Sequence, residues 1–334
     1  MAIKVAINGF GRIGRNTFRA ALGKNLKQLN FVAINDLTSP ENLAYLLQYD
    51  TAYGNSDLKI GFTKDSLIVN GKKIKIYAQK DPSVLPWKKL GINVVLECTG
   101  FFTNKEGAEL HLKAGAKKVI VSAPAKELPT VVFGANAHKS EKVEAINMGS
   151  CTTNCVAPIT AIIDSSLGIK KAWMTTIHSY TSTQKLQDGP SQKDVRRGRA
   201  AAQNIVPTTT GAAKATVETL PQLKNKFDAM SVRVPTITGS LSDFTFLVKK
   251  KTTTQKVINI LKKAKKNSIW KNVIELSEGG LVSSDIIGNP YSAIIDLPFT
   301  NVIKGDMVKI LAWYDNEWGY SSRLAEMAVE VGKN

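Results

Sequence analysis

The 334-residue chain has few cysteines, no long apolar run and far fewer acidic than basic residues. Three cysteines, Cys98, Cys151 and Cys155, are too few and odd in number for a disulfide framework, which favours a reducing compartment and leaves free thiols. No stretch approaches the roughly 18 consecutive apolar residues that a membrane-spanning helix requires. Met1 is followed directly by an apolar strand pattern and not by a targeting signal, so we expect a cytoplasmic protein.

The charge is one-sided, with 45 basic and 27 acidic residues and a formal net charge of +18. Such a surplus is typical of proteins that bind nucleic acid and also of proteins that attract anionic substrates. The lysines are scattered, and the densest run, 249–266, interleaves with apolar residues at helical spacing, which indicates a helix with one solvated face. Because no nucleic-acid-binding motif accompanies the charge, we expect no dedicated nucleic-acid binding.

The first half of the chain alternates short apolar runs with helical patterns, which predicts a parallel sheet flanked by helices. The expected strands are 3–8, 31–35, 94–98 and 118–122. The expected helices are 13–24, 41–47 and 105–114. Residues 67–76 read as two strands joined by Asn70-Gly71, the pair that a type I′ hairpin turn prefers, and they predict an antiparallel excursion of this sheet.

The second half has longer intervals between its strand patterns. The expected strands are 230–234, 244–248, 293–295 and 308–313, and the expected helices are 211–220 and 254–266. This rhythm predicts a mainly antiparallel sheet with helices on one side. Since the length suits two domains, we predict an α/β domain over residues 1–150 and an α+β domain over 151–316, with a C-terminal helix in 317–334 that packs back on the first domain.

Glycines follow the first expected strand in the pattern G-x-G-x-x-G, as Gly9, Gly11 and Gly14. The first permits a tight turn, the second lets the backbone approach a pyrophosphate, and the third allows close packing of helix on strand. The helix N-terminus offers free N–H groups to the phosphates. Asp36, 22 residues after the last glycine, suits two ribose hydroxyls and repels a 2′-phosphate. The combination predicts a Rossmann-type domain that binds NAD.

Two further polar residues, Lys80 and Ser122, follow later strand patterns of the same sheet. Ligands bind at this edge of a parallel sheet. A surface lysine and a loop serine without a ligand would have the same sequence pattern, so both interpretations stay open.

A cysteine stands where the next helix is expected to begin. Ser150 suits the N-cap of a helix whose apolar periodicity runs over 156–167, which places Cys151 in its first turn. A helix N-terminus favours the thiolate, so we predict a lowered pKa for Cys151. His178 ends an apolar strand pattern beside hydroxyl residues and would complete a Cys–His pair. An inert buried thiol and a core histidine are the structural alternative.

The other cysteines and histidines are expected to be structural. Cys155 lies one turn further on the apolar side of the same helix, and Cys98 ends a core strand. His111 and His138 fall in a helix and a loop of the first domain. The spacing of the cysteines and histidines fits no common zinc pattern, so we expect no metal site.

Two features of the second half suit anions. Residues 207–213 enter a helix with threonine hydroxyls and Gly211, which suits a phosphate, although an ordinary N-cap has the same pattern. Arg233 lies in an apolar strand pattern, and a guanidinium there needs an anionic partner because burying it unpaired is costly. Arg197 lies with two other arginines in a polar segment, either as surface charge or as a clamp.

Four segments together make the chain recognisable: INGFGRIGR at 7–15, SCTTNC at 150–155, TTTGAAK at 208–214 and WYDNEWGY at 313–320. The chain resembles phosphorylating glyceraldehyde-3-phosphate dehydrogenase over essentially its whole length. The resemblance implies a homotetrameric enzyme of glycolysis or gluconeogenesis that uses NAD and inorganic phosphate. It would convert D-glyceraldehyde 3-phosphate to 1,3-bisphosphoglycerate through a cysteine thioester.

The resemblance also implies roles for individual residues. Cys151 would be the nucleophile, with His178 as its base and as a donor to the developing oxyanion. NAD would be contacted by Arg12, Ile13, Asp36, Lys80, Ser122 and Asn316. The substrate phosphate would be held by Thr181 and Arg233. The attacking phosphate would be bound by Ser150, Thr152, Arg197, Thr210 and Gly211. The segment 179–202 would form a loop shared at the cofactor sites of the tetramer.

The chain departs from the family pattern before the nucleophile, where Asn147-Met148-Gly149 replaces the common Ser-Asn-Ala, and at Lys80, which replaces a frequent arginine. The nearest alternative is erythrose-4-phosphate dehydrogenase, a relative with the same cysteine chemistry that hydrolyses its thioester. The pair Thr210-Gly211 and Thr181 favour the phosphorylating enzyme.

Overall fold

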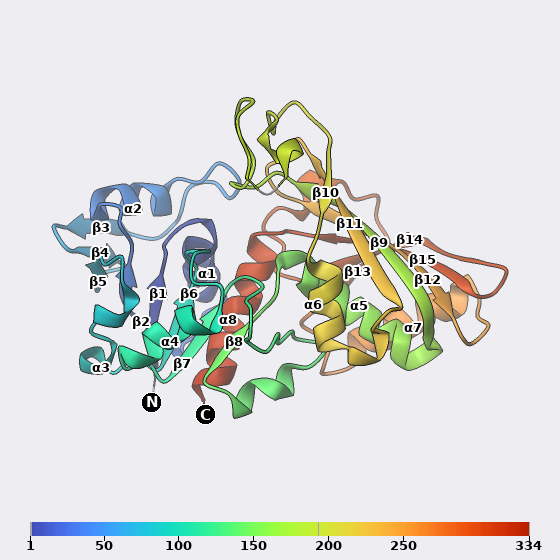
Figure 1. Cartoon of the computed structure of the whole chain (residues 1–334), viewed down its shortest axis with the longest axis horizontal. Helices are drawn as coiled ribbons and strands as arrows, with labels where there is room; N and C mark the ends of the chain where they lie inside the picture. The colour runs from blue at the N-terminus through green and yellow to red at the C-terminus, as the bar shows by residue number, and fades with distance from the viewer. Residues whose placement is uncertain (1, 193, 334) are drawn as a thin grey trace. The chain divides into compact units, whose positions relative to one another are not determined.

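The computed structural model describes residues 2–192 and 194–333. Met1, Lys193 and Asn334, which fall within segments predicted above, lie outside the described residues. The chain divides into two compact units (Figure 1). The first comprises Met1–Val131, His138–Gly149 and Ser321–Asn334, and the second comprises Val132–Ala137 and Ser150–Tyr320. The short segment 132–137 therefore groups with the second unit, which the sequence patterns did not indicate.

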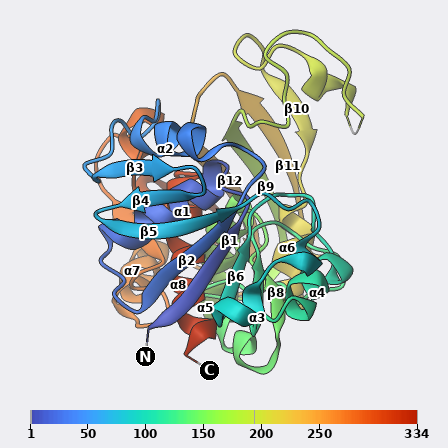
Figure 2. The same cartoon turned by 90° about the vertical axis from the view of Figure 1, so that its left-hand side faces the viewer.

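The first unit is built on a sheet of eight strands in the order β3-β4-β5-β2-β1-β6-β7-β8 (Figure 2). The strands are β1 (Ile3–Asn8), β2 (Leu29–Asn35), β3 (Ile60–Thr63), β4 (Ser66–Val69), β5 (Lys72–Tyr77), β6 (Val94–Glu97), β7 (Lys118–Val121) and β8 (Ala145–Asn147). The six strands in the run β5-β2-β1-β6-β7-β8 all pair in parallel with their neighbours. The β3-β4-β5 part is antiparallel, and Asn70 and Gly71 both have positive φ, as a type I′ turn requires.

The helices of the first unit cover this sheet. They are α1 (Arg12–Gly23), α2 (Pro40–Gln48), α3 (Trp87–Leu90), α4 (Lys105–Lys113) and most of α8 (Trp318–Gly332). Helix α1 buries Phe18, whose ring forms T-shaped pairs with the rings of Phe10 and Phe31. The end of α8 packs closely on β1, since a Cβ at Gly332 would lie 2.5 Å from the Ile3 side chain.

The second unit has a seven-stranded sheet in the order β10-β11-β9-β12-β15-β14-β13. The strands are β9 (Ile169–Ser179), β10 (Val206–Thr209), β11 (Phe227–Val234), β12 (Ser240–Val248), β13 (Ile274–Ser277), β14 (Ala293–Ile303) and β15 (Met307–Tyr314). Four of the six neighbouring pairs are antiparallel, while β11–β9 and β13–β14 are parallel. The sheet is therefore mainly antiparallel.

Helices α5 (Cys151–Leu167), α6 (Ala212–Thr219) and α7 (Thr254–Lys266) gather along one side of this second sheet (Figure 1). The burial of side chains alternates along β12. Phe244, Phe246 and Val248 are fully buried in the core on the side of these helices. The residues between them point to the opposite face and are half-buried. The second sheet thus has one covered and one open face.

The predicted fold class is confirmed: a Rossmann-type parallel-sheet unit precedes an α+β unit with a mainly antiparallel sheet. The short strands β3, β8, β10 and β13 were not predicted. Over residues 2–192 and 194–333, no helix has both the length and the apolar character needed to cross a membrane.

Candidate active site

Two of the three glycines after β1 have no room for a side chain, and the third has open space beside it. Gly9 has φ +87°, and a Cβ there would lie 2.8 Å from the backbone nitrogen of Thr99. A Cβ at Gly14 would lie 2.2 Å from the carbonyl oxygen of Gly9. By contrast, a Cβ at Gly11 would meet nothing within 4 Å, so the backbone there is open to a close ligand. This is the arrangement that a bound pyrophosphate requires.

The glycine turn borders a groove of about 580 Å³ in the first unit. Asp36 lines it, with one carboxylate oxygen 2.7 Å from the Phe10 N–H and the other 2.9 Å from the Thr38 N–H. These two backbone donors fix the carboxylate and leave it further acceptor capacity for hydroxyls. Lys80 lines the same groove and is exposed. The donors and acceptors present therefore fit a dinucleotide.

Cys98 also lines this groove, so the prediction that it packs in the core is wrong. Strand β6 ends one residue earlier, at Glu97, which leaves Cys98 beyond the sheet and only partly buried. Burial of its thiol nevertheless raises the pKa to about 12, against a hydrogen bond from Ser122 that lowers it. The thiol stays protonated at neutral pH and is a poor nucleophile.

The other predicted cofactor residues have defined partners. Arg12 forms an ion pair of 2.5 Å with Asp50 and lies over the ring of Tyr53. Ile13 is half-buried in the first turn of α1. Asn316 belongs to the second unit, where its side-chain oxygen lies 2.8 Å from the Ser240 hydroxyl, which donates to it. That bond orients the Asn316 amide group.

In the second unit, α5 begins at Cys151 because Ser150 caps it. The Ser150 hydroxyl accepts a hydrogen bond of 3.1 Å from the Thr153 N–H, and the Thr153 hydroxyl accepts one of 3.2 Å from the Ser150 N–H. This capping box holds the cysteine in the first turn of the helix. The Cys151 Sγ lies 3.4 Å from His178 Nε2, at the end of β9. The structure thus brings the predicted pair together.

Nδ1 of His178 has one hydrogen-bond acceptor and one donor as neighbours. Nδ1 lies 2.7 Å from the carbonyl oxygen of Ser179 and 2.8 Å from Nη1 of Arg233. The carbonyl oxygen only accepts hydrogen bonds and Nη1 only donates them, and Nη1 also donates to the same oxygen over 3.1 Å. The contacts of Nδ1 are therefore compatible with both neutral tautomers of His178. In the tautomer with the proton on Nδ1, Nε2 would turn an unprotonated lone pair towards the Cys151 thiol.

Burial and charge set the protonation states of the pair. Burial, and then the nearby positive charge of Arg233, lowers the pKa of His178 to about 3, so the imidazole is neutral at pH 7. Burial raises the pKa of Cys151, although Arg233 and Thr152 act in the opposite direction. The prediction of a lowered Cys151 pKa is therefore wrong, because burial outweighs the helix N-terminus. The thiol needs a base, and His178 provides one at hydrogen-bonding distance.

Arg233 lies directly opposite His178 in the pairing of β11 with β9. Within the described residues, its buried Nε has no hydrogen-bond partner and no carboxylate lies within ion-pair distance. A buried guanidinium without an anion is costly. Beside a cysteine nucleophile, this unbalanced positive charge fits an anionic substrate.

The remaining predicted anion-binding residues lie on or near β10 and the preceding loop. Arg197 donates from Nε to the Thr208 hydroxyl over 2.9 Å and from Nη2 to the Thr209 carbonyl over 3.1 Å. Thr210 accepts from the Ala212 N–H at the start of α6, whose N-cap is the exposed Gly211. The Thr181 hydroxyl contacts that of Thr183, at 2.9 Å.

Two predicted phosphate ligands direct their hydroxyls elsewhere. Ser150 uses its hydroxyl in the capping box, and Thr152 is buried with its hydroxyl 2.9 Å from that of Tyr314. Tyr314 also contacts the Thr176 hydroxyl at 2.8 Å. The sequence reasoning missed Tyr314 and Thr176, although Tyr314 lies in the WYDNEWGY segment. Among the described residues, no three His, Cys, Asp or Glu side chains are grouped to hold a metal ion.

Comparisons with known proteins agree with this geometry. A family profile described as "Glyceraldehyde 3-phosphate dehydrogenase, NAD binding domain" matches residues 3–105, and one for the C-terminal domain of the same enzyme matches residues 150–316. The chain is 48% identical to glyceraldehyde-3-phosphate dehydrogenase of Streptomyces coelicolor over 335 residues, 99% of each chain. It is also 48% identical to glyceraldehyde-3-phosphate dehydrogenase 1 of Bacillus subtilis over 336 residues, 100% of this chain and 99% of the other.

These matches confirm the resemblance that the four motifs indicated, and they place the family's NAD-binding domain in the first unit. The chain belongs to the glyceraldehyde-3-phosphate dehydrogenase family.

Proposed function

We propose that this protein is a phosphorylating, NAD-dependent glyceraldehyde-3-phosphate dehydrogenase that converts D-glyceraldehyde 3-phosphate to 1,3-bisphosphoglycerate. The observation that carries the proposal is Nε2 of His178, 3.4 Å from Cys151 Sγ, with the unbalanced charge of Arg233 beside it. In this proposal the neutral ring carries its proton on Nδ1, so Nε2 accepts. A nucleophile, its base and an anion receptor are thereby held in one cluster.

The first step forms a carbon–sulfur bond. His178 Nε2 accepts the thiol proton of Cys151 as the sulfur attacks the aldehyde carbon, and the resulting Nε2–H gives that proton to the carbonyl oxygen. The product is a thiohemiacetal. The positive charge of Arg233 makes an imidazolium unfavourable, so the proton passes on readily. Binding of an anionic substrate at Arg233 would raise the pKa of His178 towards the range in which a base is effective.

The second and third steps make and break a thioester. His178 removes the hydroxyl proton while the carbon loses a hydride, and NAD, when bound, is the acceptor of that hydride. The carbon is now a thioester of Cys151. The protonated His178 releases to the solvent the proton that it took from the hydroxyl. An oxygen of inorganic phosphate then attacks the thioester, the carbon–sulfur bond breaks, and the phosphate proton passes to the sulfur. The acyl phosphate leaves and the thiol is restored.

The anion-binding residues divide between two phosphates in this proposal. Arg233 and Thr181 hold the phosphate of the substrate. Arg197, Thr210 and Gly211 bind the attacking phosphate, with the exposed N-terminus of α6 as donor. Ser150 and Thr152 contribute through the first turn of α5, since their hydroxyls already have partners.

The first unit holds NAD in the groove beside Gly9, Gly11 and Gly14. Asp36 receives the ribose hydroxyls, and its charge selects against a 2′-phosphate. Arg12, Ile13, Lys80, Ser122 and Asn316 complete the proposed contacts. In this proposal the two units are the NAD-binding and catalytic domains, and the free thiols fit the cytoplasm as the compartment.

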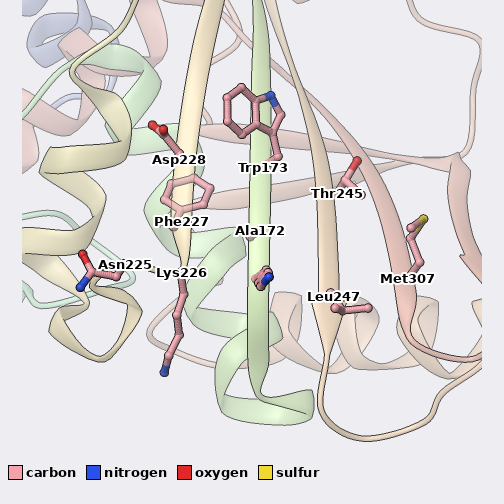
Figure 3. A pocket seen from close by; sticks show the side chains of 10 residues that line it. Ala172, Trp173, Asn225, Lys226, Phe227, Asp228, Thr245, Leu247 and Met307 are labelled. Carbon is pink, nitrogen blue, oxygen red and sulfur yellow. The ribbon is translucent and has the colours of Figure 1, made fainter.

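We also propose that the enzyme is a homotetramer. The open face of the second sheet carries a hollow of about 670 Å³ lined by Trp173, Phe227, Leu247 and Met307 (Figure 3). Trp173 is 47% exposed there, and the loop 179–202 carries Leu186 at 89% exposure. Exposed apolar side chains on a flat sheet face are typical of subunit contacts. Light scattering should give four times the mass of the chain, and Trp173→Lys should lower it.

The test of the activity is NADH formation from glyceraldehyde 3-phosphate with and without phosphate. We expect sustained turnover only with phosphate, no activity in Cys151→Ser, and near-normal activity in Cys155→Ser, a matched thiol that is fully buried. Turnover that does not depend on phosphate would instead identify the hydrolytic erythrose-4-phosphate type. Activity in Cys151→Ser would refute the covalent mechanism.

A further inference from the structure

A row of buried side chains lies under the cofactor groove. Strands β2, β1 and β6 are neighbours in the first sheet (Figure 2). Their last residues, Asn35, Asn8 and Glu97, are in register with one another. Asn35 donates to Asn8 over 2.7 Å, and Asn8 donates to Glu97 over 2.5 Å. All three are almost completely buried. The residues that follow them line the groove: Asp36, Gly9 and Cys98.

Two further buried residues continue the row at Glu97. The indole nitrogen of Trp87 lies 3.1 Å from His111 Nδ1, and His111 Nε2 lies 3.1 Å from a Glu97 oxygen. An indole N–H only donates, so Nδ1 must be the unprotonated nitrogen. Nε2 of His111 therefore carries the proton that it donates to Glu97.

The second oxygen of Glu97 holds the chain beside the glycine turn. It accepts from the Thr99 N–H over 2.8 Å and from the Thr99 hydroxyl. The same backbone nitrogen is the atom that a Cβ at Gly9 would meet at 2.8 Å. Glu97 therefore accepts four hydrogen bonds, about the number that a carboxylate can accept. Loss of one donor leaves buried polar groups unsatisfied, at the point against which the turn packs.

We propose that Glu97 and His111 are positioning residues for NAD. They fix the carboxyl ends of three strands, and through Asn8 and Thr99 they hold the glycine turn in the geometry that receives the pyrophosphate. They act through these neighbours and not by touching the cofactor. The inference rests on the NAD site of the proposed function, but it concerns binding and not turnover.

The experiment is a direct NAD titration by calorimetry on the full chain, with its melting temperature measured in parallel. His111→Leu removes both the acceptor for Trp87 and the donor to Glu97, and we expect its Kd for NAD to rise about tenfold, which corresponds to one misplaced buried hydrogen bond. His111→Gln offers both an acceptor and a donor and should restore Kd to within about threefold. Alkylation of Cys151 in the absence of NAD should be unchanged in both variants.

Leu67→Ala is the matched control, since Leu67 is a fully buried residue of β4 in the same unit and outside the row. It should lower the melting temperature and leave Kd unchanged. The proposal would be overturned if Leu67→Ala raised the Kd for NAD as it lowered the melting temperature. It would also be overturned if His111→Leu bound NAD with the wild-type Kd. If His111→Leu is insoluble, Glu97→Gln takes its place with the same expectation. Normal NAD binding with no aldehyde oxidation would refute the proposed function alone.

Discussion

The thiol of Cys151 and the imidazole of His178 are held within hydrogen-bonding distance of one another. Nε2 of His178 lies 3.4 Å from Cys151 Sγ, while Nδ1 on the opposite side of the ring lies 2.7 Å from the Ser179 carbonyl. In the proposed mechanism the proton is on Nδ1, where it is donated to this carbonyl, so Nε2 is the acceptor that the thiol meets. A thiol whose pKa is raised by burial depends on this acceptor.

Replacing His178 by Asn removes the base and keeps a polar side chain. We expect kcat for aldehyde oxidation to fall by about 10²–10⁴-fold, the usual contribution of a general base. Alkylation of Cys151 by iodoacetamide at pH 7 should slow as well. Steady-state NADH formation and the alkylation rate measure the two effects. His138→Asn, at an exposed histidine of the first unit, should behave like the wild type in both assays. A His178→Asn variant with normal kcat would contradict the role of the base.

The lowered pKa of His178 also predicts a pH dependence of stability. The folded pKa is about 3, below the ordinary value of 6.5, so between these values the unfolded chain binds the proton and the folded chain does not. The free energy of unfolding therefore has its full value, as far as His178 is concerned, above pH 6.5, and it decreases as the pH falls from 6.5 towards 3. At pH 5 this decrease amounts to about 2 kcal/mol. Urea unfolding at pH 7 and pH 5 should show a loss smaller by this amount in His178→Asn. Equal losses in both proteins would contradict the lowered pKa.

Much of the fold is predictable because its elements are long and periodic. Helix α7 begins and ends at the predicted residues, since its apolar and lysine positions alternate at helical spacing over thirteen residues. The Asn70-Gly71 turn is equally local. Strands β8 and β10 have only three and four residues and show no periodicity of their own. They form because neighbouring strands offer unpaired backbone groups, which no local pattern reveals.

The candidate site divides in the same way. Ser150 and Cys151 belong to one helix start, so the cap and the position of the thiol follow from adjacent residues. The pKa of Cys151 depends on burial by distant strands, and a rule based on the helix N-terminus alone gave the wrong direction. Likewise Tyr314 meets Thr152 across 162 positions of sequence, a contact that needs the completed sheet.

Arg233 influences both members of the catalytic pair. Its charge lowers the pKa of His178 and opposes the rise in the pKa of Cys151 that burial causes. In Arg233→Leu we expect the midpoint of Cys151 alkylation to move to higher pH and KM for the substrate to rise at least tenfold, since a charged hydrogen bond contributes about 1.5–3 kcal/mol. Arg233→Lys keeps the charge and loses the planar fork, so its alkylation midpoint should stay near that of the wild type while KM still rises. An unchanged midpoint in Arg233→Leu would contradict the electrostatic role.

A glycine-to-alanine substitution should affect folding at Gly14 and cofactor binding at Gly11, so the two effects can be measured separately. A Cβ at Gly14 would lie 2.2 Å from the Gly9 carbonyl, a backbone atom that cannot move without disturbing the turn. Gly14→Ala should therefore lower the unfolding free energy by about 1–3 kcal/mol, as overpacking does. At Gly11 the backbone has φ −72°, and a Cβ would meet nothing within 4 Å. Gly11→Ala should keep wild-type stability and yet weaken NAD binding about tenfold or more, because its methyl group would occupy the space of the pyrophosphate. Urea unfolding and calorimetric titration of the two variants distinguish these effects, and normal NAD affinity in Gly11→Ala would exclude close approach of the cofactor at this residue.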